Sequence, residues 1–186
     1  MEITTDVMLK GPIWVNTIDK LSVLFPKRAN YDVFLLSLAI GIMYDKRIDK
    51  FDDEEVEPRS VPRNVLQNQG NDGKLDFMFQ AAILSTKTMQ LSEDERLKMA
   101  FGESDDHNIQ ENQFNKLGFL VEFANFGVTK LAEKIADNDV DTMENIKDFL
   151  TSTVEGYNFD INAIPDDVLL DDNDDLDSEN DDGQLW

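Results

Sequence analysis

The sequence contains no cysteine among its 186 residues, and this absence excludes several kinds of chemistry. Without thiols the chain forms no disulfide, holds no thiolate-bound metal and has no cysteine nucleophile. The absence also fits a reducing compartment such as the cytosol. Histidine is nearly absent as well, and His107 is the single example. Because histidine-based metal sites normally recruit several imidazoles, we interpret His107 as a solvated loop residue rather than a ligand or a general base.

Long hydrophobic runs are missing too. The longest run, from Val33 to Tyr44, has 12 residues, whereas a helix needs about 20 apolar residues to span a bilayer. The first fifteen residues do not show the basic start and apolar core of a signal peptide. We therefore expect a soluble, cytoplasmic protein that makes no contact with a membrane.

The sequence has no motif that is typical of a phosphate or metal site. Its glycines are isolated and form neither GxGxxG nor GxxxxGK[ST]. The run Asp137–Asp141 alternates acids as a calcium loop does, but Thr142 and Asp148 stand where the EF-hand loop needs Gly and Glu. We interpret these acids as helix-capping residues. Other carboxylates are too numerous to single out a catalytic pair, so we expect no enzymatic activity, no cofactor and no metal.

Acidic residues are abundant and unevenly placed. The formal net charge is -22, yet residues 1–50 hold seven Lys and Arg against six Asp and Glu. Residues 137–186, in contrast, hold seventeen acids and one lysine. Eight of the thirteen residues from Asp171 to Gly183 are acidic, a composition that favours disorder. The sequence therefore predicts a single helical domain over residues 1–160 and a flexible acidic tail over residues 161–186.

The stretch from Asn30 to Lys50 is the most hydrophobic part of the chain. Asn30 is a typical N-cap residue, and Asp32 falls in the first turn, where the helix dipole favours an acid. Apolar side chains then cover nearly the whole circumference, which is typical of a helix in the middle of a bundle. Gly41 weakens the helix locally and so indicates a close contact with another helix. We predict a buried central helix over residues 30–45.

Helical periodicity predicts most of the remaining elements. Ser92 and Glu95 form a capping-box pattern, and Gly102 would end the helix that they start. Strand signals are weak and confined to the N-terminus and residues 56–66. The residues 13–15 would form a short strand or anchor the N-terminus on the core. Further helices are expected over 17–25 (ended by Pro26), from Lys74, over 114–135 with a break near 125–127, and from Asp141 to Gly156. The fold class is therefore mainly α, a compact bundle of five or six helices around the helix 30–45.

Two groups of basic residues flank the predicted central helix. Lys27 and Arg28 precede it, whereas Lys46, Arg47 and Lys50 follow it. One interpretation is that they are solvated residues, the second group being favourable charges at the helix C-terminus. The other is that they contact the phosphate backbone of DNA or an acidic partner. The net charge of the whole chain disfavours nucleic acid.

Part of the sequence resembles a known family. The chain resembles the accessory proteins encoded beside prokaryotic DNA phosphorothioation (Dnd) systems, the Dnd-associated or DndE-like proteins. The resemblance lies in the stretch YDVFLLSLAIGIMYDKRI and, later in the chain, in LSEDERLKMAFG and KLGFLVEFANFGVTKL. The shared features are Tyr31-Asp32-Val33-Phe34, Ala39-Ile40-Gly41 and Lys46-Arg47, and the resemblance covers about residues 27–135. It implies a DNA-modification or anti-phage context, an accessory role and partners among the other proteins of that system. The acidic C-terminus departs from the family pattern.

Two functional hypotheses follow. The first is an accessory protein of such a defence system, which acts by binding partner proteins and in one version also DNA. The second is an acidic DNA mimic that occupies a nucleic-acid-binding protein with its carboxylates. The resemblance favours the first hypothesis, and the charge of -22 favours the second. The sequence does not predict the oligomeric state.

Overall fold

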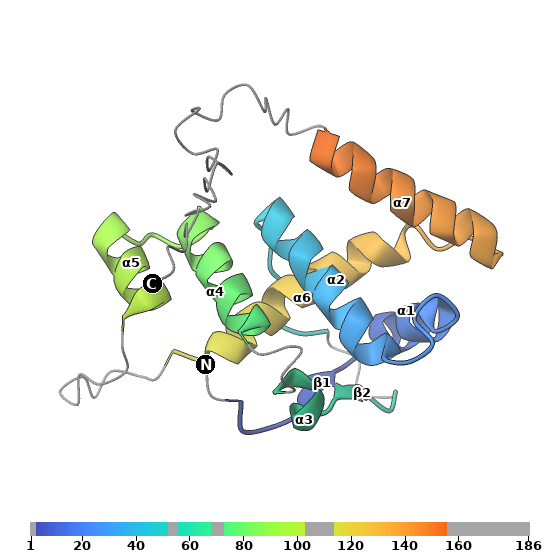
Figure 1. Ribbon diagram of the computed structural model, residues 1–186, viewed down its shortest axis with the longest axis horizontal. Coiled ribbons are helices and arrows are strands. Elements are labelled where there is room, and N and C mark those ends of the chain that lie inside the picture. The colour runs from blue at the N-terminus through green and yellow to red at the C-terminus, as the bar shows by residue number, and fades with distance from the viewer. Residues whose placement is uncertain (1–2, 52–55, 68–72, 103–113, 156–186) are drawn as a thin grey trace, which may run out of the picture. The chain divides into compact units, whose positions relative to one another are not determined.

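The computed structural model describes residues 3–51, 56–67, 73–102 and 114–155. Within these ranges the chain forms seven helices and two short strands, so the prediction of a mainly α fold is confirmed (Figure 1). In chain order they are β1 (Val7–Leu9), α1 (Pro12–Leu21), α2 (Ala29–Tyr44), β2 (Arg59–Val61), α3 (Arg63–Leu66), α4 (Lys74–Ser85), α5 (Glu93–Phe101), α6 (Lys116–Ala132) and α7 (Asp139–Glu155). The predicted acidic tail over residues 161–186 and His107 lie outside the described residues. None of the described helices is long and apolar enough to cross a membrane.

The chain divides into two compact units, Met1–Phe149 and Leu150–Trp186. The first contains both strands, α1 to α6 and most of α7. Of the second, only the last turns of α7 belong to the described residues.

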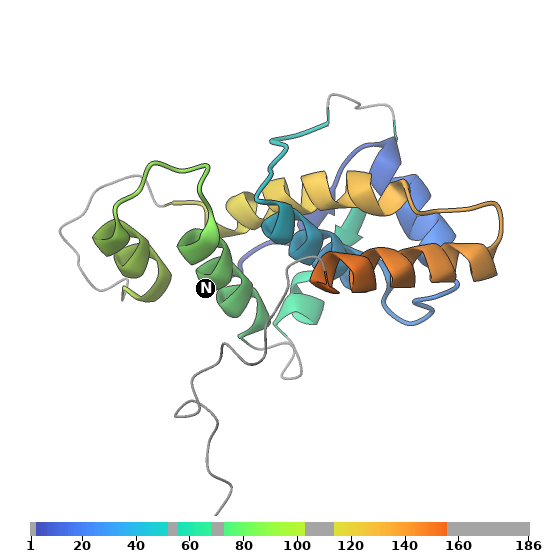
Figure 2. The same ribbon diagram turned by 90° about the horizontal axis from the view of Figure 1, so that it is seen from above.

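Helices α2 and α6 form the centre of the first unit. Figure 1 shows α2 crossing α6, and in Figure 2 the two helices lie side by side. Phe34 and Leu38 of α2 and Phe123 and Leu131 of α6 are almost completely buried. Two glycines permit this close packing. A Cβ atom at Gly41 would collide with the Phe123 carbonyl group, and one at Gly127 would collide with the Ser37 carbonyl group. The predicted close helix contact at Gly41 is therefore confirmed.

The predicted break in the helix near residues 125–127 is wrong, because α6 is continuous from Lys116 to Ala132. Gly127 does not interrupt the helix, since the missing side chain serves the contact with α2. Asn125 also stays in the helix, and its side chain is used for tertiary hydrogen bonds instead of a turn. The sequence signal for a break was therefore a signal for close packing.

The start of α2 also differs from the prediction. The helix begins at Ala29, and the N-cap position is held by Arg28, which makes no side-chain capping bond. The Asn30 side chain instead donates to the Ser60 carbonyl oxygen at 2.7 Å. This bond ties α2 to β2, so a residue expected to cap the helix locally makes a long-range contact.

The N-terminal helix lies earlier than predicted. Pro12 occupies the first turn of α1, where its missing N–H costs nothing, and the preceding Gly11 has a φ of 95°. The helix ends at Leu21 and does not extend to Pro26. Trp14, expected in a strand or an anchoring segment, is a fully buried residue of this helix. It anchors the N-terminal region on the core.

The strand signals at the N-terminus and within residues 56–66 are confirmed. Strands β1 and β2 pair antiparallel, with Val7 opposite Val61 and Leu9 opposite Arg59. Val7, Leu9 and Val61 are buried, so this ribbon covers one end of the helical core.

Helices α4 and α5 form a hairpin in which α5 packs on α4 (Figures 1 and 2). The predicted capping box is confirmed, because the Ser92 side chain accepts from the Glu95 N–H and the Glu95 carboxylate accepts from the Ser92 N–H at 2.8 Å. The hydrogen bonds from the Ser92 side chain and backbone lower the pKa of the Glu95 carboxyl group. Arg96 donates to the carbonyl oxygens of Ile83 and Met89 and so closes the loop between the two helices.

Candidate functional site

The five predicted contact residues lie at the two ends of α2. Lys27 and Arg28 are exposed just before the helix, and Lys46, Arg47 and Lys50 follow its C-terminal end. A helix of sixteen residues is about 24 Å long. The structure therefore does not bring the two basic groups together into one site.

Arg47 is engaged within the fold. Its guanidinium pairs with the Glu122 carboxylate at 3.1 Å and lies over the rings of Phe119 and Phe123, at 5.1 and 5.7 Å from their centroids. A weaker bond of 3.4 Å runs to the Thr88 hydroxyl. These contacts occupy the planar face and part of the edge of the guanidinium, so Arg47 serves the packing of α6 more than an external phosphate.

The other predicted cations are more accessible. The Lys46 ammonium lies 5.7 Å from the centroid of the Phe126 ring, and the Arg28 guanidinium lies 5.2 Å from that of Tyr31. Lys27 and Lys50 are exposed. Burial raises the pKa of the Tyr31 phenol, against the opposing effect of Arg28. Each end of α2 thus offers a small exposed positive charge rather than a basic groove.

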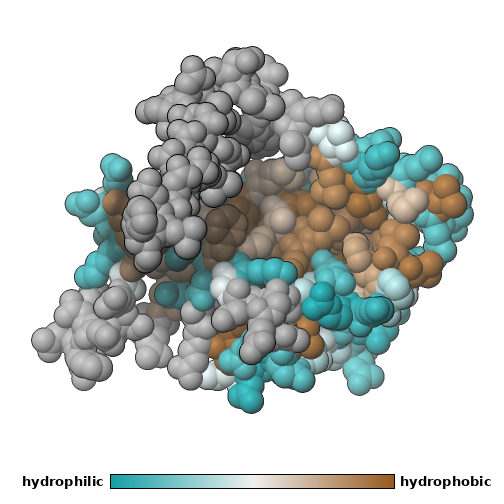
Figure 3. Space-filling model, viewed as in Figure 1, coloured by the Kyte–Doolittle hydropathy of each residue, from teal (hydrophilic) through white to brown (hydrophobic). Residues whose placement is uncertain are grey.

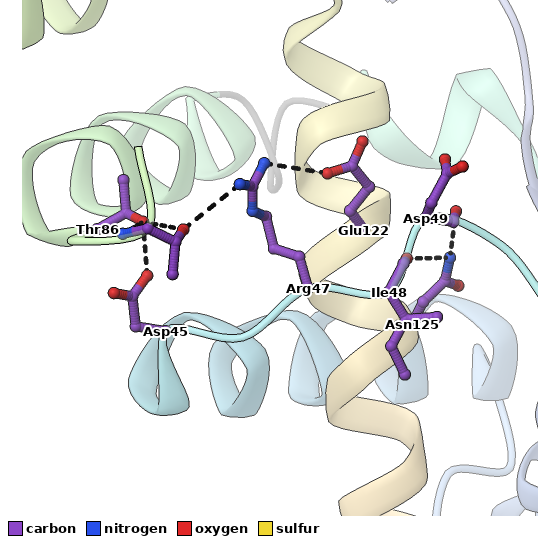
Figure 4. A network of polar contacts seen from close by, with 8 residues as sticks. Asp45, Arg47, Ile48, Asp49, Thr86, Glu122 and Asn125 are labelled. Atoms are coloured by element: carbon purple, nitrogen blue, oxygen red, sulfur yellow. Dashed lines mark hydrogen bonds and ion pairs between the residues drawn. The ribbon is translucent and has the colours of Figure 1, made fainter. Parts of the chain in front are cut away.

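A network of polar contacts holds the segment that follows α2 (Figure 4). Asp45 adopts the left-handed conformation that ends the helix, with φ of 49°. Its carboxylate accepts from the Thr86 hydroxyl at 2.5 Å and from the Lys87 N–H at 2.7 Å. The N–H of Ile48 donates to the Glu122 carbonyl oxygen at 3.0 Å. Residues 45–48 are therefore fastened to the loop after α4 and to α6.

The buried side chain of Asn125 completes this network. Its amide donates to the carbonyl oxygens of Ile48 and Asp49, both at 3.1 Å, and its carbonyl oxygen accepts from the Trp14 indole N–H at 2.9 Å. One residue of α6 thus joins α1 to the segment after α2, and Figure 4 shows its bonds to Ile48 and Asp49. Sequence reasoning interpreted Asn125 only as part of a helix break and assigned no role to Asp45, and no local pattern could have linked Asn125 to Trp14, 111 positions away.

An open depression of about 490 Å³ lies beside this network. It is lined by Asp45, Lys46, Arg47, Ile48, Thr88 and Phe126. Two cations, one acid and apolar atoms of Phe126 and Ile48 face it, so it can accommodate a side chain of a partner but contains no evident catalytic group.

The residues after α6 form a helix start. The side-chain oxygen of Asn138 accepts a hydrogen bond from the Asp141 backbone N–H at 2.9 Å, and the side-chain NH2 group of Asn138 donates to the Asp141 carboxylate at 2.7 Å. The predicted helix start is confirmed, but the interpretation of the acids as capping residues is wrong, because Asn138 caps the helix and Asp139 and Asp141 lie in its first turn. Within residues 3–51, 56–67, 73–102 and 114–155, no three His, Asp or Glu side chains are gathered as a metal would require.

Helices α4 and α5 expose large apolar side chains, a feature that sequence reasoning missed. On α4, Phe77 is 70% exposed and Leu84 40%, and on α5, Phe101 is 58% and Leu97 46% exposed. Residues 77 and 84 share one face of α4, and residues 97 and 101 share one face of α5. We call these four side chains the α4–α5 apolar faces. Their signal in the sequence was that Phe77 and Leu84 lie outside the buried stripe of Leu75, Phe79, Ala82 and Ile83.

Acidic and basic residues are divided unequally between the described and the remaining parts of the chain. All 17 Lys and Arg fall within the described residues, whereas 21 of the 39 Asp and Glu fall outside them. The remaining 18 acids leave the described part with a formal charge of -1. The strong negative charge of the chain is therefore carried by residues 1–2, 52–55, 68–72, 103–113 and 156–186.

No protein-family model, curated protein or solved structure matches this chain. The fold defines the class, a small and mainly α-helical protein. The resemblance to Dnd-associated accessory proteins stays a prediction.

Proposed function

We propose that the chain is an accessory protein that acts by binding a partner protein through the α4–α5 apolar faces. The observation that carries the proposal is the exposure of Phe77 and Phe101, at 70% and 58%. Exposed apolar side chains grouped on neighbouring helices are typical of protein interaction sites. Aromatic side chains in particular supply the binding energy of many interfaces.

Covering these residues would contribute binding energy in proportion to their exposed apolar surface. Full burial of a Phe or Leu side chain is favourable by about 1.5–3 kcal/mol. Phe77 and Phe101, 70% and 58% exposed, would gain more than half of that amount each, and Leu84 and Leu97, 40% and 46% exposed, would gain less than half. These four side chains would form the apolar centre of the contact. Lys98 is exposed and lies between Leu97 and Phe101 in the sequence. It would lie at the polar rim of such an interface, where charges set specificity and association rate.

The biological context of the proposal comes from the resemblance of residues 27–135 to Dnd-associated proteins. In that context the partners are other proteins of a DNA-modification or anti-phage defence system. Direct DNA contact through Lys46 and Arg47 has weaker support, because Arg47 is already paired with Glu122 and stacked on two phenylalanine rings.

The DNA-mimic hypothesis also has weaker support. A mimic of duplex DNA has to hold carboxylates in a dense, fixed array, since the duplex carries one charge per about 1.7 Å. The described residues hold 18 acids against 17 bases. Mimicry would therefore rest on the acid-rich segments outside them.

Co-purification from the native host tests the proposal. The tagged full-length chain is compared with the double variant Phe77→Ser/Phe101→Ser and with Val23→Ser/Val140→Ser, a control in which both valines are 62% exposed. After nuclease treatment, we expect a partner protein to co-purify with the wild type and with the valine control but not with Phe77→Ser/Phe101→Ser. Equal recovery with both variants, or no partner above background, contradicts the proposal. Recovery that depends on DNA and is lost in Lys46→Glu/Arg47→Glu would instead support direct DNA contact.

A further inference from the structure

Helix α2 keeps apolar side chains at the surface, but they favour no particular ligand. Leu35, Leu36 and Ile42 are half-buried and Ala39 is exposed, and Figure 3 shows apolar surface in the middle of the molecule, where α2 lies in Figure 1. None of these four side chains carries a charge or a hydrogen-bonding group, so they do not select one chemistry in a partner. The depression beyond the end of the same helix differs, because its lining combines charged with apolar side chains. We call it the Lys46 depression.

The walls of the Lys46 depression come from three parts of the chain that hydrogen bonds fasten together. They are the segment after α2, the loop between α4 and α5, and α6, which contribute Asp45, Lys46, Arg47, Ile48, Thr88 and Phe126. The Asp45 carboxylate accepts hydrogen bonds from Thr86 and Lys87. The Ile48 N–H donates to the Glu122 carbonyl oxygen. The volume of about 490 Å³ is typical of ligand sites, about 300–1,000 Å³, and the walls are in place before a ligand enters.

Lys46 is the cation of this lining that stays available to a ligand. The Arg47 guanidinium pairs with the Glu122 carboxylate at 3.1 Å, so its charge is compensated within the fold. The carboxylate of Asp45 is engaged as well, through its two hydrogen bonds to the loop after α4. Lys46 is exposed and makes no ion pair with any described residue, and its ammonium lies 5.7 Å from the centroid of the Phe126 ring. Its ammonium can therefore donate hydrogen bonds to an incoming anion beside an apolar surface.

The lining suits a single carboxylate that has an apolar neighbour. The carboxylate would lie at the Lys46 ammonium, and the apolar group would cover the Phe126 ring and the Ile48 side chain. A phosphate monoester carries about two charges at neutral pH, so the Asp45 carboxylate in the same lining would repel it more strongly than it repels a single carboxylate. A DNA duplex presents one charge per about 1.7 Å, whereas the lining offers Lys46 as its available cation.

We propose that the Lys46 depression binds an acidic side chain of a protein partner together with an apolar residue beside it. The acid accepts charge-assisted hydrogen bonds from Lys46, and the apolar residue removes the exposed surface of Phe126 and Ile48 from water. The proposal does not rest on the α4–α5 apolar faces, since none of their four residues lines the depression. The contact is small, so a short peptide that carries only these two residues binds weakly, with a millimolar dissociation constant.

NMR titration of the full-length chain with two blocked dipeptides tests the proposal. One dipeptide contains phenylalanine and glutamate. The other has glutamine in place of glutamate, so it has the same size without the charge. With the first, we expect saturable shifts of the backbone signals of residues 45–48, Thr88 and Phe126. The second should bind about fivefold more weakly, because it lacks the ion pair with Lys46.

Three variants make the test specific for Lys46. Lys46→Gln should bind both dipeptides equally, with the affinity that wild type has for the glutamine form, because only the charged pair is lost. Lys20→Gln, at an exposed position of α1, is the matched control and should keep the preference for glutamate. Phe77→Ser/Phe101→Ser should keep this preference too, which separates the Lys46 depression from the α4–α5 apolar faces.

Several results would overturn the proposal. They are the absence of saturable shifts at the lining residues, an equal affinity of wild type for the two dipeptides, and a preference for glutamate that Lys46→Gln retains. Inorganic phosphate that binds at the same residues more tightly than the glutamate dipeptide would also overturn it, because the depression would then be a simple anion site.

Discussion

The substitution Gly127→Ala tests the packing at the centre of the fold. A Cβ atom at this position would collide with the carbonyl group of Ser37 in α2 and would lie 3.0 Å from the backbone nitrogen of Gly41. Both are backbone atoms inside a helix, so neither can rotate away as a side chain would. The added methyl group therefore has to push α2 and α6 apart.

Two opposing effects determine the magnitude. Overpacking of a well-packed core typically costs about 1–3 kcal/mol, and a rigid backbone contact falls at the upper end or beyond. Replacing glycine by alanine inside a helix gains about 0.8–1 kcal/mol of helix propensity. The helix separation also loosens the buried contacts of Phe34 and Phe123. We expect a net loss of about 2 kcal/mol or more in the free energy of unfolding, from a total of about 5–15 kcal/mol.

Urea denaturation followed by circular dichroism measures this loss as a lower midpoint with an unchanged slope. Gly118→Ala is the matched control on the same helix. At Gly118 the three atoms nearest to the new Cβ all belong to the side chain of Asn115, which can move at the cost of its capping bond, about 1 kcal/mol. The control should therefore stay within about 1 kcal/mol of wild type, because helix propensity offsets the lost cap. If Gly127→Ala were as stable as wild type, the proposed close contact between α2 and α6 would be refuted.

Three further substitutions test individual contacts. Asn125→Ala removes the hydrogen-bond partner of the buried Trp14 indole N–H and of two carbonyl oxygens. Urea denaturation should therefore show that the free energy of unfolding falls by about 2–4 kcal/mol. A decrease below about 0.5 kcal/mol would contradict the hydrogen-bond network. Tyr31→Phe removes a buried hydroxyl that has no hydrogen-bond partner among the described residues. The free energy of unfolding should therefore stay constant or rise by up to about 1 kcal/mol. A clear decrease would show that the Tyr31 hydroxyl makes a stabilising hydrogen bond. Ser92→Ala removes the side-chain hydrogen bond that is the largest cause of the lowered pKa of Glu95, whereas the backbone N–H of residue 92 still donates to the Glu95 carboxylate. A carboxyl group whose pKa is lowered by folding stabilises the fold above its ordinary pKa, and this stabilisation is lost as the pH falls through the folded-state pKa. The difference in unfolding free energy between wild type and Ser92→Ala should therefore become smaller on acidification. A difference that does not change with pH would contradict the capping box.

Local signals in the sequence predicted the helices well where the physics is local. The capping box of Ser92 and Glu95 needs only residues three positions apart, and it is confirmed. The predicted central helix over residues 30–45 agrees with α2 (Ala29–Tyr44) to within one residue at each end. Gly41 was interpretable because an isolated glycine in an apolar helix has few other uses.

Other features depended on contacts between distant residues and could not be predicted in this way. Asn30 has the sequence signature of an N-cap, but the Ser60 carbonyl group competes for its side chain. Gly127 and Asn125 look like a helix break, yet each is fixed by a partner on another element. A tertiary contact can override a local preference of about 1 kcal/mol.

The candidate site shows the same limit. The sequence identified the basic residues at the ends of α2, but not that Arg47 is taken up by Glu122 and two phenylalanine rings. It also did not identify the α4–α5 apolar faces. Periodicity shows that a helix has a buried stripe, but which of the remaining apolar side chains stay exposed depends on where the neighbouring helices lie.

The most direct test of the central claim is hydrogen exchange of the full-length chain, alone and bound to the partner that co-purifies with it. We expect binding to slow amide exchange most strongly in α4 and α5, around Phe77 and Phe101. Unchanged exchange in both helices, with protection confined to residues 45–50 or to the acid-rich C-terminal segment, would contradict it.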